Sequence, residues 1–224
     1  MLTATACGSY LEGMNYIRKT FRYSYFNATF ILIGVNLLAF LAQSMLPQAT
    51  AYLALNPRNV LEAGAYWQFI TYMFAHGDLS HLLMNMLGLF FFGTQVERKV
   101  GSAEFVVYYL VTGLLAGAFS FAVYVLTGSW YVYLLGASGA VFAVLLAYAT
   151  FFPDSLIYIW GILPLRAPIM VLGYTAIEVG SMLFGFKQGV AHLTHLAGFG
   201  FAWLYFVVRF GANPWRSLIG HRRW

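Results

Sequence analysis

Six apolar stretches, each about long enough to cross a bilayer, constrain the fold of this chain more than any other feature. A spanning helix needs about 20 mostly apolar residues at a rise of about 1.5 Å per residue. The predicted spans are Ala28–Leu46, Leu79–Val96, Phe105–Leu126, Leu135–Phe152, Pro168–Phe186 and Gly189–Phe210. They are hydrophobic around most of the helix circumference and do not alternate, which excludes barrel strands. We therefore predict an all-α membrane protein, a bundle of six transmembrane helices.

The composition excludes several other classes of protein. Of 224 residues, 61% are hydrophobic and 8% charged, against about 45–50% and about 25% in an average soluble domain. So few charges argue against a disordered chain or an ordinary cytosolic enzyme. The net charge of +5 does not indicate nucleic-acid binding, because the basic residues punctuate apolar runs instead of clustering among aromatics on a wet face. The single cysteine, Cys7, excludes an intramolecular disulfide, and residues 1–22 do not resemble a cleaved signal peptide.

The distribution of Lys and Arg predicts the orientation in the membrane. If the N-terminus is cytoplasmic, Arg58 and Lys187 lie outside and the other ten basic residues lie inside. Cytoplasmic loops carry the excess of positive charge, so both termini are expected in the cytoplasm. The predicted organisation is a core at residues 28–210 between a short cytoplasmic segment, 1–27, and a basic cytoplasmic tail, 211–224. We expect a multi-pass protein of a bacterial inner (plasma) membrane.

The longest loop, residues 47–78, is predicted to lie outside the cytoplasm. Its aromatic and aliphatic residues interleave with Asn56, Arg58 and Glu62. This mixture suits a segment in the membrane interface, where Trp and Tyr bury their apolar bodies and keep their polar tips wet. The loop is either an interfacial anchor or a gate to lateral access.

Polar groups within the spans indicate where a functional site would lie, because such groups are costly in lipid and usually face the interior. His81 and Asn85 are four residues apart near the outer end of the second span, so they share a helix face. Both can donate hydrogen bonds. On their own they could equally hold neighbouring helices together.

Ser138 opens the predicted fourth helix in the segment Gly-Ala-Ser-Gly-Ala, residues 136–140. The glycines on both sides let other backbone come close and leave the hydroxyl unshielded. The motif differs from the Gly-x-Ser-x-Gly elbow of α/β-hydrolases, because the second glycine directly follows the serine. Serine among small residues also packs helices together, so the motif alone leaves its role open.

His195 lies on a stripe of small residues with Gly198 and Ala202. A comparable row on the predicted fourth helix is formed by Ala140, Ala143 and Ala147. If the two rows pack together, Ser138 and His195 come within hydrogen-bond reach, and the imidazole could take the serine proton. A nucleophile, a base and a pair of donors are the three roles of acyl transfer. The donors for a developing oxyanion would be His81, Asn85 and the Ser138 backbone N–H.

In order and spacing, these motifs resemble those of the rhomboid intramembrane serine proteases. The matching residues are Gly136–Gly139, His81 with Asn85, and Ala191–Gly198, with further similarity at Gly93, Glu97-Arg98 and Gly101. The resemblance covers roughly residues 28–210 and implies a rhomboid-like six-helix bundle. It also implies endopeptidase activity on transmembrane segments of other proteins, near the outer face of the bilayer.

The resemblance implies a role for each site residue. Ser138 would be the nucleophile and His195 the general base, without a metal or an organic cofactor. His81 and Asn85 would help to bind the oxyanion, with Gly136 lining the site. Two departures are noted. Members often carry Trp-Arg where this chain has Trp67-Gln68, and Phe142 stands where some bacterial members place a Tyr that stacks on the base.

Four other polar residues have less certain roles. Glu178 has no basic residue in its own span. It could orient His195 as a third member, but the dyad of the similar family favours interior polar packing or a hydrogen bond to a neighbouring helix. Asp78 precedes the second span and is expected to cap it. We expect His76 to hydrogen-bond within the loop and His192 to be a wet interfacial histidine.

Competing functions lack their sequence signatures. A zinc protease needs His-Glu-x-x-His, which is absent, although His76, His81, His192 and His195 leave a surface zinc site open. An aspartyl protease needs two intramembrane aspartates, and Asp78 and Asp154 lie at span edges. A transporter predicts inverted repeats and midplane sites, which are not evident. An inactive rhomboid-like binder of membrane clients usually lacks the serine or the histidine, and this chain has both.

Overall fold

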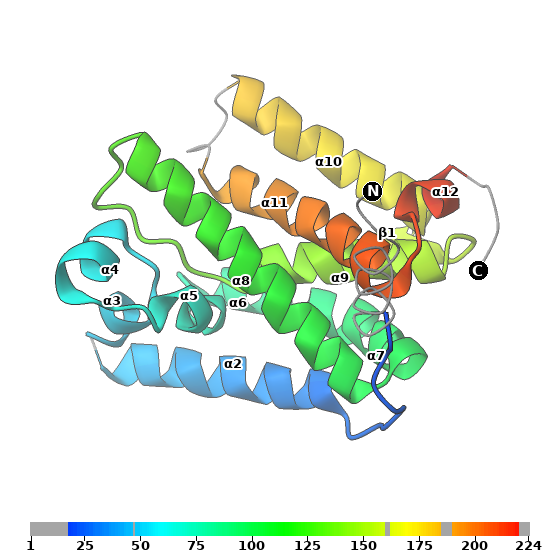
Figure 1. Ribbon diagram of the computed structural model, residues 1–224, viewed down its shortest axis with the longest axis horizontal. Helices are drawn as coiled ribbons and strands as arrows, with labels where there is room; N and C mark the ends of the chain where they lie inside the picture. Colours follow the sequence, from blue (N-terminus) through cyan, green and yellow to red (C-terminus); the bar gives the residue numbers. More distant parts are fainter. Residues whose placement is uncertain (1–17, 47, 160–161, 185–189, 220–224) are drawn as a thin grey trace, which may run out of the picture.

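Helices built from the apolar stretches form the body of the molecule (Figure 1). The computed structural model describes residues 18–46, 48–159, 162–184 and 190–219. The main helices are α2 (Ala28–Met45), α6 (Leu79–Gly88), α7 (Thr94–Val100), α8 (Ser102–Leu126), α9 (Ser138–Phe151), α10 (Ala167–Phe184) and α11 (Val190–Tyr205). The π turns η2 (Leu89–Gly93) and η3 (Phe206–Phe210) join α6 to α7 and extend α11. The predicted all-α multi-pass fold is confirmed.

Within the described residues, five of these helical runs are long and apolar enough to cross a membrane. The remaining predicted span corresponds to α9, which has 14 residues and begins at Ser138 instead of Leu135. The chain before α9 is not helical because Gly136 has φ +117° and its N–H bonds to the carbonyl of Tyr72 at 3.0 Å. At a rise of about 1.5 Å per residue, α9 is roughly 21 Å long, well short of the about 30 Å of a bilayer core.

The buried carboxylate of Glu97 fixes the start of α2. Asn27, before the helix, adopts a left-handed conformation and its side chain caps nothing. Glu97 instead accepts hydrogen bonds from the N–H groups of Ala28 (2.6 Å) and Thr29 (2.9 Å) and from the Thr29 hydroxyl (2.7 Å). A carboxylate satisfies the unpaired N–H groups at a helix N-terminus and complements its dipole. The second predicted span therefore continues past Val96 to hold α2 in place.

Small residues let α8, α9 and α11 approach one another closely, as in many membrane helix packings. A Cβ added to Gly198 of α11 would lie 2.1 Å from the carbonyl oxygen of Gly139 on α9. A Cβ on Gly139 would lie 3.2 Å from the Cβ of Ala116 on α8. The fourth and sixth spans pack together as predicted, but the close contact on α9 is made by Gly139 and not by the predicted row of Ala140, Ala143 and Ala147; Ala140 instead lies near Gly113 of α8.

The long loop folds into short helices at one end of the bundle, away from α12 (Pro214–Leu218) (Figure 1). Its elements are α3 (Ala49–Leu53), α4 (Pro57–Ala63), α5 (Gln68–Thr71) and the 3-10 turn η1 (Tyr72–Phe74). Leu55, Tyr72 and Met73 are fully buried, whereas Tyr66 and Trp67 remain exposed. The exposed aromatics suit the predicted interfacial position. The loop also contributes to the core, a role that its sequence does not predict.

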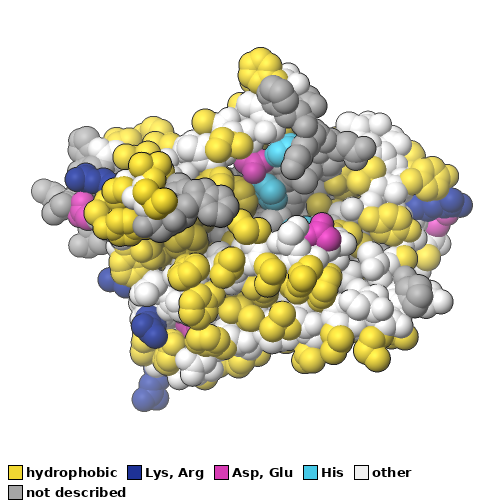
Figure 2. Space-filling view, turned by 180° about the vertical axis from the view of Figure 1, so that it is seen from behind, with side chains coloured by type: hydrophobic (Ala, Val, Ile, Leu, Met, Phe, Trp, Pro, Cys, Tyr) yellow, Lys and Arg dark blue, Asp and Glu magenta, His cyan; other side chains and the backbone are white. Residues whose placement is uncertain are grey.

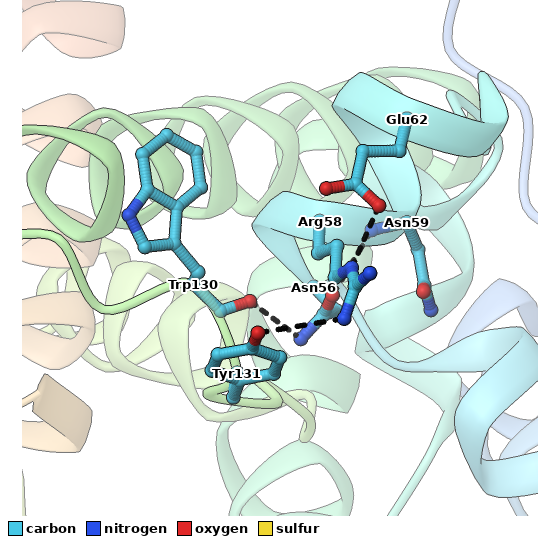
Figure 3. A network of polar contacts seen from close by, with 6 residues as sticks. All are labelled: Asn56, Arg58, Asn59, Glu62, Trp130 and Tyr131. Carbon is cyan, nitrogen blue, oxygen red and sulfur yellow. Dashed lines mark hydrogen bonds and ion pairs between the residues drawn. The ribbon is translucent and has the colours of Figure 1, made fainter.

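Hydrogen bonds join α4 to the segment between α8 and α9 (Figure 3). The Asn56 side chain accepts from the Asn59 N–H at 3.0 Å and donates to the Trp130 carbonyl at 3.2 Å. Arg58 binds Glu62 at 2.6 Å and the Tyr131 hydroxyl at 3.4 Å. The contact of Asn56 with Trp130 ties α4 to the chain that leads into Ser138, whereas the Arg58–Glu62 pair lies exposed on the surface of α4.

Gln68 replaces the arginine that the similar family often carries, and it makes uncharged contacts within the loop. Its side-chain oxygen accepts from the Asn56 N–H at 3.1 Å, and its amide donates to the carbonyls of Ala51 (3.0 Å) and Tyr52 (3.2 Å). The departure at this position therefore still ties the loop together without a salt bridge.

An antiparallel hairpin between α9 and α10 was not predicted from the sequence. Strand β1 (Leu156–Ile159) pairs with β2 (Leu163–Arg166). Near this end of the bundle, Arg209 of η3 makes two 2.8 Å hydrogen bonds to the buried carboxylate of Glu104 on α8. The bidentate pair links the last helical run to α8.

Candidate active site

The side chains of Ser138 and His195 meet between α9 and α11. Ser138 is the first residue of α9, and its Oγ lies 2.7 Å from Nε2 of His195. His195 is in the second turn of α11, three residues before Gly198. The close contact of Gly198 with Gly139 therefore sets the distance between the two functional groups.

An aromatic ring covers the imidazole of His195. The ring of Phe142, one turn after Ser138 on α9, stacks on it with centroids 4.3 Å apart and an angle of 13° between the planes. Tyr174 and Phe199 pack against Phe142 in turn. This apolar packing restricts rotation of the histidine ring, so its two nitrogens face fixed directions.

His81 and Asn85 line the same pocket as Ser138, and Gly136 packs beside His81. Gly136 packs against the His81 ring so closely that an added Cβ would lie 2.6 Å from Cε1 and from Nε2. The Asn85 amide donates to the His81 carbonyl at 2.8 Å, which leaves its second N–H for another acceptor. Asp78 caps α6, as predicted, by accepting from the His81 N–H at 2.7 Å.

A cavity of about 510 Å³ lies between α6 with η2, α9 and α10. His81, Asn85, Ser138 and His195 supply its polar wall. The rest is mostly apolar and extends past Leu145 to the hairpin residues Ile157 and Tyr158; other members of this wall are Met84, Leu87, Phe91, Phe142 and Met170. Figure 2 shows histidine and acidic side chains together in a hollow on this face. The cavity could therefore receive an apolar segment that enters between α6 and α10.

The carboxylate of Glu178 on α10 contacts two histidines of α11. One oxygen lies 2.9 Å from Nδ1 of His195, and the other hydrogen-bonds Nδ1 of His192. Glu178 is 6% exposed. A hydrogen bond to a neighbouring helix was one predicted alternative for this residue. One of its two partners is His195, the contact that the resemblance to a dyad family argued against. The one signal in the sequence was a carboxylate in a span without a basic neighbour.

The prediction for His192 was wrong, and the one for His76 is met only by a weak contact. The His192 side chain is 14% exposed and is held by Glu178, so it is not a wet interfacial residue. His76 is buried; among the described residues its ring nitrogens make no hydrogen bond of good geometry, and the backbone of Phe74, in the same loop, supplies only a weak one. Its ring packs edge-on against His81, with centroids 5.1 Å apart. Burial, and to a lesser extent the nearby His81, lowers the pKa of His76 to about 4.

The structure also changes which residues could form the zinc site that the sequence leaves open. In the described part of the chain, the group whose ligand atoms lie within 4.8 Å of one another is Glu178, His192 and His195, without His76 or His81. The same nitrogen and oxygen atoms already hydrogen-bond to each other. The sequence also predicts a loop at residues 184–190 that would cover the site, but residues 185–189 lie outside the described part of the chain.

Comparison with known proteins gives one family throughout. Residues 63–212 match the family model of the Rhomboid domain. RHOMBOID-like protein 4 of Arabidopsis thaliana is 29% identical over 146 residues, which are 65% of this chain and 34% of that protein. Rhomboid protease GlpG of Salmonella choleraesuis is 29% identical over 118 residues, 52% and 41% of the two chains.

A mitochondrial relative is similar to the same degree. The presenilin-associated rhomboid-like protein of Rattus norvegicus is 32% identical over 127 residues, 56% of this chain and 33% of that protein. The chain thus spans between a third and about two fifths of the length of these three relatives.

Proposed function

This chain belongs to the rhomboid family, and we propose that it is an intramembrane serine endopeptidase that cleaves transmembrane segments of other membrane proteins. The observation that carries the proposal is the 2.7 Å contact of Ser138 Oγ with His195 Nε2 at the wall of an apolar cavity. Hydroxyls are weak nucleophiles until a positioned base accepts their proton. The contact supplies that base.

The proposed reaction begins with attack of Ser138 Oγ on a substrate carbonyl while His195 Nε2 takes the hydroxyl proton. The resulting oxyanion would accept hydrogen bonds from Asn85, His81 and the backbone N–H of Ser138. The last of these belongs to the first turn of α9, where N–H groups lack helical acceptors and the dipole favours negative charge. His195 then protonates the leaving amine, and a water molecule that it activates hydrolyses the acyl-enzyme.

Lateral entry between α6 and α10 is the route that the cavity supports. Its walls are apolar and partly exposed: Leu87 and Phe91 on one side and Tyr174 on the other. A helical substrate shields its peptide carbonyls through its own hydrogen bonds, so it must unwind locally before attack. We therefore expect small or helix-breaking residues near the cleaved bond.

The short α9 is consistent with cleavage below the membrane surface. Because this helix is roughly 21 Å long, Ser138 at its start would lie inside the bilayer. The segment that leads into Gly136 lies against the long loop at Tyr72, and we expect water to reach Ser138 there from the outer side. We propose a bacterial inner membrane as its location; GlpG of Salmonella is a bacterial relative, and the mitochondrial relative marks the alternative.

Replacement of the nucleophile tests this function. Ser138→Ala should abolish cleavage of a reporter transmembrane segment by the purified protein in detergent and in liposomes. Ser44→Ala, which removes an exposed hydroxyl bound to a carbonyl of its own helix, is the matched control and should leave the rate unchanged. Full activity of Ser138→Ala would contradict the assignment. Binding of the reporter by the native chain without any cleavage would instead favour an inactive client binder.

A further inference from the structure

We propose that Glu178 is a positioning residue for His195, so that the site works as a Ser138–His195–Glu178 chain in which His192 holds the carboxylate. The inference rests on the proposed function and goes beyond a dyad. It follows from one juxtaposition: the two oxygens of a buried carboxylate on α10 each meet Nδ1 of a different histidine on α11.

The contact with Glu178 decides which nitrogen of His195 carries the hydrogen. An ionised carboxylate can only accept hydrogen bonds, so the 2.9 Å contact requires a hydrogen on Nδ1. In the neutral ring, Nε2 then keeps its lone pair, and Nε2 faces the Ser138 hydroxyl at 2.7 Å. This is the tautomer that a general base needs. Stacking on Phe142 alone would not distinguish the two tautomers.

His192 holds the second oxygen and so fixes the plane of the carboxylate. His192 and His195 are three residues apart on α11, which brings both rings to the face that meets α10. With its hydrogen on Nδ1, His192 has a bare lone pair on Nε2. That atom is buried and has no hydrogen-bond partner among the described residues. No other hydrogen bond within the described part of the chain therefore draws His192 away from Glu178.

The position of the Glu178 carboxylate within a membrane span favours a functional role for it. Ionisable groups in spans are costly and usually functional, and Glu178 is 6% exposed in a helix with no other charged residue. When His195 accepts the proton of Ser138, it becomes a cation beside this carboxylate. Its existing hydrogen bond then joins two charged groups and becomes a stronger ion pair. The pair favours the charge that develops during attack.

The amide substitution Glu178→Gln tests the proposal. It keeps the size of the side chain, but its NH₂ group can donate to Nδ1 of His195 and so favour the unproductive tautomer. We expect kcat on the reporter segment to fall by on the order of 10²–10⁴ while KM changes by less than about twofold. Glu178→Asp retains the carboxylate and should recover part of the lost kcat. The matched control is Glu62→Gln, an exposed carboxylate bound to Arg58, with no expected effect.

Folding of each variant is checked by its thermal midpoint and by gel filtration in detergent. If Glu178→Gln does not fold, His192→Gln serves as the second variant, because it loosens the carboxylate while leaving the charge. It should lower kcat by about tenfold, a size common for residues that orient an active group.

The outcomes separate the inference from the function on which it rests. Native kcat in a folded Glu178→Gln, with Ser138→Ala inactive, would overturn the role of Glu178 and leave the protease assignment standing. A rise in KM with unchanged kcat would overturn it as well. The three residues could also ligate a metal: loss of activity in EDTA and its recovery with Zn²⁺ would replace the proposal, whereas an unchanged rate in EDTA supports it.

Discussion

Gly136 shows how a single residue sets the geometry of the site. Its φ of +117° is rare for residues with a side chain, and the His81 ring occupies the space that a Cβ would need. The backbone N–H of Gly136 also donates a hydrogen bond to the Tyr72 carbonyl. A glycine here lets Ser138 begin a helix directly beside His81.

Gly136→Ala should therefore lower both stability and activity. The backbone strain and the displaced His81 ring should cost about 1–3 kcal/mol of unfolding free energy and reduce reporter cleavage at least about tenfold. The control is Gly173→Ala in the middle of α10, where a Cβ meets no atom within 4 Å. That variant should be neutral or more stable by up to about 1 kcal/mol. Equal behaviour of the two variants in thermal unfolding and cleavage would contradict this account.

His76 gives a prediction for pH. Its pKa is lowered from 6.5 to about 4, so between these values the unfolded chain binds a proton that the folded chain excludes. Stability then rises with pH across this window and falls as the solution is acidified. In His76→Phe this contribution disappears. Its thermal midpoint should fall less than that of the native chain between about pH 7 and about pH 5. An equal or larger fall in the variant would show that His76 does not exclude the proton.

The residues of the site differ in how far the sequence predicts them. Ser138, His81 and Asn85 lie in short motifs whose spacing fixes a shared helix face or an unshielded hydroxyl. The partner of Glu178 depends on how α10 packs against α11, and spacing along one helix contains no information about it. The wrong prediction for His192 has the same cause, because its burial is set by another element.

At the scale of elements, the contact of α9 with α11 controls the distance between the nucleophile and the base. The carbonyl of Gly139 occupies the position that a Cβ on Gly198 would take. Gly139 directly follows Ser138, and Gly198 lies one turn after His195. A change in the separation of these helices therefore changes the distance between Ser138 Oγ and His195 Nε2 by nearly the same amount.

Gly198→Ala should push α11 away from α9. We expect a loss of about 1–3 kcal/mol of stability and a fall in cleavage of about 10²-fold, since small misplacements of reacting groups are costly. The control Gly200→Ala lies on the same helix where a Cβ meets nothing within 4 Å. It should retain the native rate. Native activity in Gly198→Ala would show that the helix contact does not set the site geometry.

The elements themselves were predictable where burial in lipid is the deciding force. Apolar stretches of about 20 residues locate the spans, and most observed ends lie within four residues of the predicted ones. Other features depend on specific contacts. The late start of α9 follows from the conformation of Gly136, and the extension of the second span to Val100 accompanies the contacts of Glu97 with α2. The hairpin β1–β2 and the helices of the long loop have no comparable apolar signal.

At the scale of the whole molecule, the orientation in the membrane stays a prediction from the basic residues. The chain offers a direct test because Cys7 is its one cysteine. A membrane-impermeant maleimide should label Cys7 only after the cytoplasmic side is opened. In a Cys7→Ser background, Tyr131→Cys, at a position that is 73% exposed, should be labelled from outside in intact spheroplasts. The reverse pattern would invert the topology and place Ser138 toward the cytoplasmic face.

Activation of Ser138 by His195 is the claim on which all scales depend, and labelling with a fluorophosphonate measures it directly. The reagent modifies activated serines, and mass analysis of the labelled peptide identifies the residue. We predict labelling of the native protein at Ser138, strongly reduced labelling of His195→Ala, and none of Ser138→Ala. Unchanged labelling of Ser138→Ala, or a label found on another residue, would contradict the account.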